Sequence, residues 1–167
     1  MKIAVQDANV LIDLEIAGLF DLWFQLGIET HTSCFIRKEL EDGEHMQALA
    51  YFKSQHVQAH DLTYEELEQI SDLESQIGSR AGFNDCSVLF LAIKLDAMLI
   101  SGDRALRNAG QAQCIEVHGT LWIFDLLVSK GVISGEIAAS KLEYLISMER
   151  FLPPTECSHR IAKWRKS

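Results

Sequence analysis

Residues 1–19, MKIAVQDANVLIDLEIAGL, contain the first change from strand to helix in this chain of 167 residues. Residues 2–6 are mostly apolar, as a buried strand is, and Val10 begins an apolar pattern with helical spacing. Asp7 and Asn9 lie at the junction. A helix N-cap would explain them, because Asp and Asn side chains accept hydrogen bonds from the first free amides of a helix. A metal site would also explain them.

The same alternation of strand and helix continues along the chain. Strand-like segments are expected at residues 2–6, 28–33, 57–62, 97–101 and 114–117, with amphipathic helical patterns between them. Alternating strands and helices produce a mainly parallel sheet that is covered on both faces. We therefore predict an α/β domain, a three-layer α/β/α sandwich with a central sheet of about five strands.

Composition restricts the class of protein. The hydrophobic fraction of 48% is ordinary for one globular domain, and no run of residues is long and apolar enough for a membrane span. The first residues also lack the pattern of a signal peptide, so a cytoplasmic protein is expected. The net charge of −9 argues against a protein that coats nucleic acid. It leaves open an enzyme that cuts nucleic acid at an acidic, metal-neutralised site.

The domain is expected to span residues 1–152, with a basic C-terminal tail at 153–167. Pro153 and Pro154 are expected to end the last helix and to release the tail. Residues 158–167 contain four Lys or Arg and no acid. We expect a solvated, frayed terminus. The alternative is an arm that contacts phosphates or a protein partner.

Four acids occupy positions where strands and helices meet. Asp7 follows the first strand, Asp103 follows the strand at 97–101, and Glu39 lies in the helix after the second strand. Asp85 lies at the start of a helix, and the sequence does not decide at which end of the sheet that helix begins. Each acid alone has a structural explanation as a cap or a turn residue. Several carboxylates at one edge repel one another, and a hard divalent cation with oxygen ligands removes that conflict.

The chain resembles the PIN-domain ribonucleases, and most closely the VapC-type toxins of toxin–antitoxin pairs. The resemblance extends over nearly the whole chain in the correct order. It rests on five segments: DANVLIDL at 7–14, RKEL at 37–40, NDCSVLFLA at 84–92, LISGDRALRNAG at 99–110 and VHGTLWIFDLLVSKGVIS at 117–134. One departure is Gly102, where this branch of the family often has a second Asp before Asp103.

The resemblance implies metal-dependent hydrolysis of RNA by an acidic quartet. The expected catalytic residues are Asp7, Glu39, Asp85 and Asp103. Asp7, Asp85 and Asp103 are the expected ligands of one or two Mg²⁺ or Mn²⁺ ions, and Gly102 makes the second ion the less secure one. Asp85 and Glu39 are each expected to be either a ligand through a bound water or a general base. Asn9 and Ser101 are expected to support the metal ligands through hydrogen bonds. Arg104 and Arg107 are expected to contact RNA phosphates.

Partners and competing functions follow from the remaining features. Apolar helical stripes at residues 19–26 and 121–128 are expected either to be core or to form a homodimer or antitoxin-binding groove. A PIN scaffold that binds protein and has little or no catalysis is the principal alternative function. A haloalkanoate-dehalogenase-like phosphatase is disfavoured, because Asn9 stands where that chemistry needs a second Asp.

Overall fold

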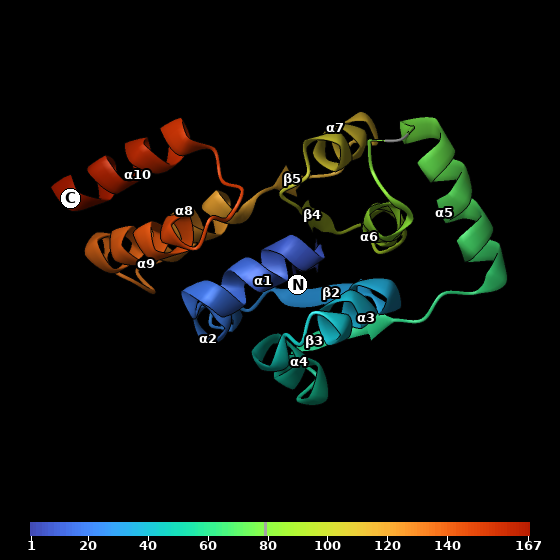
Figure 1. Ribbon diagram of the computed structural model, residues 1–167, viewed down its shortest axis with the longest axis horizontal. Helices are drawn as coiled ribbons and strands as arrows, with labels where there is room; N and C mark the ends of the chain where they lie inside the picture. The colour runs from blue at the N-terminus through green and yellow to red at the C-terminus, as the bar shows by residue number, and fades with distance from the viewer. Residues whose placement is uncertain (79) are drawn as a thin grey trace.

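The computed structural model describes residues 1–78 and 80–167, and its centre is a five-stranded sheet (Figure 1). The order of the strands is β3-β2-β1-β4-β5, and every pairing between neighbours is parallel. The predicted three-layer α/β/α sandwich with a parallel sheet is therefore confirmed. The strands are β1 (Ile3–Gln6), β2 (Glu29–Ser33), β3 (Val57–His60), β4 (Met98–Ile100) and β5 (Val117–His118).

Helices cover both faces of the sheet. Right-handed crossovers place the helices between β1 and β3 on one face and those between β3 and β5 on the other. α6 packs on β1, β2 and β4, with α5 and α7 beside it, whereas α8, α9 and α10 extend the layer of α1 (Figure 1). The helices are α1 (Ala8–Ala17), α2 (Phe20–Phe24), α3 (Cys34–Asp42), α4 (Met46–Lys53), α5 (Tyr64–Ile77), α6 (Phe83–Lys94), α7 (Arg104–Ala112), α8 (Thr120–Ser129), α9 (Gly135–Ser147) and α10 (Pro154–Lys166).

The central position of β1 determines what meets at the C-terminal edge of the sheet. Ala4 and Val5 are completely buried because helices cover both faces of this strand. Gln6, the last residue of β1, lies in register with Ile100, the last residue of β4. The residues that follow these two strands therefore leave the sheet side by side, as ligand-binding residues do in open α/β sheets.

The C-terminal tail is not frayed, and that expectation is wrong. Pro153 is the N-cap of α10 and Pro154 its first residue, where the fixed φ of proline favours a helix and the missing N–H costs nothing. α10 packs along α9, and Cys157 and Trp164 are buried there. The ring of Trp164 stacks on Phe124 of α8, with 6.0 Å between centroids. The two prolines thus begin a helix as well as ending the preceding segment.

The fifth strand and the apolar stripes also differ in part from expectation. β5 begins at Val117, three residues later than predicted, because Cys114 has a positive φ of 58° and ends the preceding turn. In the two stripes, Leu19, Trp23 and Phe124 are fully buried, so most of both stripes is core. None of the described helices combines the length and the apolar character that crossing a membrane requires.

Candidate active site

Asp7 is both a helix cap and part of a contact between two strands. Its Oδ1 accepts a hydrogen bond from the backbone N–H of Val10 at 2.9 Å, which makes it the N-cap of α1. Its Oδ2 accepts a second hydrogen bond from the hydroxyl of Ser101, directly after β4. The side chain is only 2% exposed. A cap needs only the first of these contacts, so the burial and the Ser101 contact are additional features of the position.

Ser101 connects the ends of β1 and β4. Its hydroxyl donates to Asp7 and accepts a hydrogen bond from the backbone N–H of Asp103 at 3.0 Å. Asp103 is itself the N-cap of α7, and its Oδ1 accepts from the backbone N–H of Leu106 at 2.6 Å. One hydroxyl thus links two of the predicted acidic residues.

Asp85 lies in the first turn of α6, at the same edge of the sheet. α6 leads into β4 and therefore runs antiparallel to the strands, so its N-terminus lies where the strands end. The hydroxyl of Ser87 in α6 is 2.7 Å from that of Ser33, the last residue of β2. Oδ2 of Asp85 accepts from the backbone N–H of Gly82 at 3.2 Å. The tertiary structure thus places Asp85 at the edge that holds Asp7 and Asp103.

Glu39 is at the margin of this group. It lies in the second turn of α3, its side chain is exposed, and Oε2 accepts a hydrogen bond of 3.4 Å from the side-chain amide of Asn84. Asn84 precedes Asp85 in the chain. Glu39 is therefore connected to the acidic edge through α6, while its exposed carboxylate remains accessible to solvent and to a ligand.

Electrostatic coupling joins three of the acids. Burial raises the pKa of Asp7 to about 6, against the lowering effect of the hydrogen bonds from Ser101 and Val10, and the charge of Asp85 raises it further. Burial also raises the pKa of Asp85; the Gly82 hydrogen bond opposes this, and the charge of Asp103 adds to it. Asp7, Asp85 and Asp103 therefore form a series in which neighbouring negative charges oppose one another.

The donor set suits a hard divalent cation, although the side chains do not form a closed ligand cage. Across residues 1–78 and 80–167, no three His, Cys, Asp or Glu side chains come together as a metal-binding group. Mg²⁺ commonly keeps several waters and uses only one or two protein carboxylates, so such a cage is unnecessary. In the described part of the chain, no hydrogen bond reaches Oδ1 of Asp85 or Oδ2 of Asp103. These two oxygens are available to a cation.

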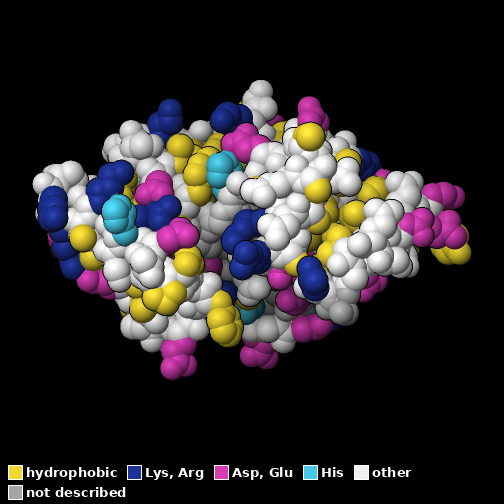
Figure 2. Space-filling model, turned by 90° about the horizontal axis from the view of Figure 1, so that it is seen from above, with side chains coloured by type: hydrophobic (Ala, Val, Ile, Leu, Met, Phe, Trp, Pro, Cys, Tyr) yellow, Lys and Arg dark blue, Asp and Glu magenta, His cyan; other side chains and the backbone are white. Residues whose placement is uncertain are grey.

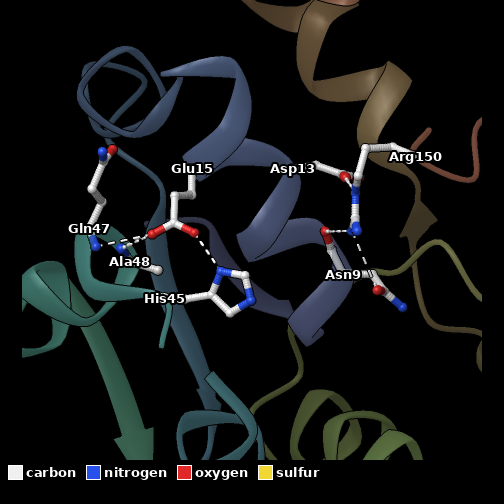
Figure 3. A network of polar contacts seen from close by, with 7 residues as sticks. All are labelled: Asn9, Asp13, Glu15, His45, Gln47, Ala48 and Arg150. Carbon is white, nitrogen blue, oxygen red and sulfur yellow. Dashed lines mark hydrogen bonds and ion pairs between the residues drawn. The ribbon is translucent and has the colours of Figure 1, made fainter. Parts of the chain in front are cut away.

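A second polar network joins Asn9 to the C-terminal helices (Figure 3). Arg150, after α9, donates from Nη2 to the backbone oxygen of Asn9 at 3.2 Å and to its Oδ1 at 3.4 Å. Its Nε donates to Oδ1 of the buried Asp13 at 2.6 Å. The hydroxyl of Thr120, the first residue of α8, donates to Oδ2 of Asp13 at 2.7 Å. Asn9 is thus held in place by residues far away in the sequence.

Sequence reasoning did not single out Asp13, Thr120 or Arg150 as a network. The sequence carries one signal for Asp13, a carboxylate inside the apolar run VLIDL of α1. A buried carboxylate requires a partner, because burying an unpaired charge is very unfavourable. No local pattern indicates that the partner is Arg150.

The two predicted RNA-contacting arginines occupy different environments. Nη1 of Arg107 donates to the backbone oxygens of Ser101 and Gly102 at 3.1 and 3.3 Å, so this side chain supports the loop before Asp103. Arg104 is exposed at the first position of α7. Both line a cleft of about 780 Å³ that extends from Asn9 and Asp103 toward α8 and α10. Arg104 is therefore the better placed of the two for a phosphate.

Comparisons with known proteins agree with this architecture. The crystal structure of PAE2754 from Pyrobaculum aerophilum is similar in fold, with a TM-score of 0.54 and 15% sequence identity over 77% of this chain and 98% of that one. No curated protein matches the sequence. A family model described as a PIN domain, DUF3368, matches residues 3–166. PIN domains are generally nucleases. The chain, with its parallel sheet and its acidic C-terminal edge, belongs to the PIN-domain family.

Proposed function

We propose that this protein is a Mg²⁺- or Mn²⁺-dependent endoribonuclease that hydrolyses phosphodiester bonds at the edge formed by Asp7, Asp85 and Asp103. The observation that carries the proposal is the gathering of these acids from three separate segments at one edge of the sheet, where the charge of Asp85 raises the pKa of Asp7 and the charge of Asp103 raises the pKa of Asp85. A structural cap requires no second or third carboxylate nearby. A bound cation offsets their mutual repulsion and at the same time attracts a phosphate.

Each residue of the site has a separate role in this proposal. Asp85 and Asp103 hold the cation through the oxygens that accept no hydrogen bond in the described structure. Asp7 was expected to be a ligand as well, but both of its oxygens accept hydrogen bonds, so in this proposal it adds negative potential from its buried position. Ser101 holds Asp7 and Asp103 at fixed positions relative to each other through its two hydrogen bonds. When bound, the cation lowers the pKa of a water and polarises a phosphoryl oxygen. Glu39, exposed to solvent, is the candidate to accept the proton of the attacking water.

The cleft beside the acids binds the substrate in this proposal. Arg104 offers an exposed guanidinium for phosphate oxygens, and such contacts position a nucleic acid without reading its sequence. Asn9 is exposed at the same cleft and is oriented by Arg150. The four acids and four arginines that line the cleft leave it near neutral, so a bound cation makes it positive. The acids are Asp13, Asp103, Asp125 and Glu156, and the arginines are Arg104, Arg107, Arg150 and Arg160.

The experiment is a cleavage assay on end-labelled single-stranded RNA with Mg²⁺, with Mn²⁺ and with chelator. Wild type is expected to cleave only with metal. Asp103→Asn is expected to abolish cleavage while it keeps the fold, because Asn is as good an N-cap as Asp. Asp72→Asn, an exposed acid on α5, is the matched control and should cleave like wild type. An active Asp103→Asn, or an inactive wild type with both ions, contradicts the proposal.

The second candidate function is a PIN scaffold that binds protein and has little or no catalysis. Two observations favour it: no three ligands are assembled in the described residues, and Gly102 stands in place of a second carboxylate. An inactive wild type that still binds a protein partner would support this function.

The role as a toxin, with an antitoxin partner and a homodimer, is a further part of the proposal. It rests on the resemblance to VapC-type toxins. Controlled expression in a bacterial host tests it: wild type is expected to arrest growth, and Asp103→Asn is expected not to do so. Unimpaired growth with wild type at a matched protein level would contradict the toxin role and leave the nuclease proposal unaffected.

A further inference from the structure

A second groove continues from the cleft, between α8 and α10. Its volume is about 610 Å³. Trp122, Asp125 and Arg160 line both the cleft and this groove, so the two are continuous. The remaining lining of the groove comes from the outer side of α8 and from one face of α10, including Leu126, Val128, His159 and Lys163. A ligand in the cleft therefore has a direct path along α10.

The rim of the groove carries an exposed lysine and an exposed histidine. His159 and Lys163 are exposed and lie one turn apart on α10, so they face the same side. Neither takes part in an ion pair with the residues that the structure describes. Arg165, by contrast, is held by Glu143 and Glu136 of α9. Figure 2 shows Lys, Arg and His side chains, with Asp and Glu among them, at the end of the face where α10 lies.

The junction between the cleft and the groove is aromatic. The ring of Trp122 stacks on that of His118, with 3.8 Å between centroids and 10° between planes. Both side chains are half-buried. Aromatic faces beside cations are the arrangement that binds single-stranded nucleic acid, because bases stack on the rings while the cations contact the phosphates.

We propose that an RNA strand with its scissile phosphate at Asp103 continues across Trp122 into the groove between α8 and α10, where Lys163 and His159 contact its phosphates. This inference rests on the proposed function. It assigns to α10 the binding of nucleotides that flank the cleaved bond, and it predicts a preference for RNAs longer than the cleft alone accommodates. An RNA strand is favoured over a peptide because Lys163 lies on a groove that is continuous with the cleft that holds Arg104 and Asp103.

The test compares RNAs of about three and about ten nucleotides, with Lys163→Ala, Lys163→Arg and a control variant, Lys53→Ala. Lys53 is also an exposed lysine in the last turn of a helix, but α4 packs on β3, at the other edge of the sheet. Fluorescence anisotropy in chelator measures binding, and cleavage in Mn²⁺ gives KM and kcat. Wild type is expected to bind the longer RNA more tightly than the shorter one.

Lys163→Ala is expected to weaken binding of the longer RNA by about fivefold at low salt and to reduce the salt slope by about 0.7. Its KM for the longer RNA should rise with kcat unchanged, and the shorter RNA should not be affected. Lys163→Arg should retain binding, and Lys53→Ala should match wild type. If Lys163→Ala loses binding but wild type cleaves no RNA, the result supports RNA binding in the groove and contradicts the proposed hydrolysis. Equal binding by wild type and Lys163→Ala overturns the inference, and capture of an acidic peptide there would assign the groove to protein.

Discussion

Arg150 and Asp13 form an ion pair of 2.6 Å that joins the end of α9 to the middle of α1, across 137 positions of the sequence. The Asp13 side chain is 8% exposed and that of Arg150 is 20% exposed, so the pair is largely shielded from water. Thr120 supplies the second hydrogen bond of Asp13. The pair thus fixes α1, α8 and α9 against one another beside the active-site edge (Figure 3).

Replacing Arg150 by Met is expected to lower the free energy of unfolding by about 3–5 kcal/mol, because Asp13 would be left buried without a countercharge. Arg165→Met removes an exposed pair between α10 and α9, which water and salt screen, and should cost far less than Arg150→Met. Urea unfolding of both variants measures the difference. The double variant Asp13→Asn, Arg150→Met should recover part of the loss, because it removes the uncompensated charge. Equal stability of Arg150→Met and Arg165→Met would contradict this account.

The raised pKa of Asp7 predicts that, in chelator, the stability of the fold decreases as the pH rises. Its pKa is raised by burial from 3.8 to about 6 in the folded protein, so the folded state binds more protons than the unfolded state between these values. The contribution of Asp7 to stability is therefore greatest below pH 4 and declines as the pH rises through 6. The total change is about 3 kcal/mol, at 1.36 kcal/mol for each pKa unit.

Asp7→Asn removes this dependence. At pH 8 the variant is expected to be more stable than wild type by roughly 3 kcal/mol, and the difference should disappear near pH 4. Urea unfolding at both pH values checks the prediction, with Asp72→Asn as the control for an exposed acid. Because Asn keeps the N-cap and removes only the charge, a variant that is less stable than wild type at pH 8 would contradict this account of Asp7.

Metal binding is expected to stabilise the fold. Mn²⁺ at a hundredfold excess over its dissociation constant should add about 2.7 kcal/mol, since it binds the folded site alone. For a domain of this size, Tm should rise by about 5–10 °C. Asp103→Asn should lose the shift and keep the chelator Tm, because the cap to Leu106 is retained. Asp103→Ala should lose the Mn²⁺-dependent shift and should also have a lower Tm in chelator, because the cap is removed. A wild-type Tm that is the same with Mn²⁺ and with chelator would argue against a metal site here.

The packing of α10 on the start of α9 depends on Gly135. A Cβ at this position would collide with the backbone carbonyl group of Trp164, which has little freedom to move. Gly135→Ala is therefore expected to cost about 1–3 kcal/mol and to increase hydrogen exchange along residues 154–166. Gly102→Ala is the control, because a Cβ at that position would have no atom within 4 Å and the φ of Gly102 is not positive. Unchanged exchange in α10 of Gly135→Ala would contradict this packing.

The local sequence pattern was sufficient to predict the sheet and the meeting of Asp7 with the loop of Asp103. Strand and helix periods follow from which side chains are buried, and a parallel sheet brings the C-terminal ends of its strands to one edge. Four of the five predicted strands overlap the observed strands closely. The PIN-domain resemblance is confirmed by the family match.

Other features required the tertiary structure. The spacing of Cys157, Ile161 and Trp164 is helical, but Pro153 and Pro154 indicated only an end to the preceding helix, and burial against α9 decided that α10 forms. Asp85 reaches the acidic edge because α6 packs on β1, β2 and β4, with its first turn at the C-terminal ends of the strands.

The sequence by itself determined the fold class, the family, and the placement of Asp7 and Asp103 after two parallel strands, because the periodicity and the quoted motifs are local features of the chain. Only the tertiary structure decided that Arg150 pairs with Asp13, that Arg107 binds backbone oxygens, and that Asp7 is a cap as well as a member of the acidic series. Contacts between residues far apart in the chain depend on how whole elements pack, and packing leaves no local periodicity in the sequence.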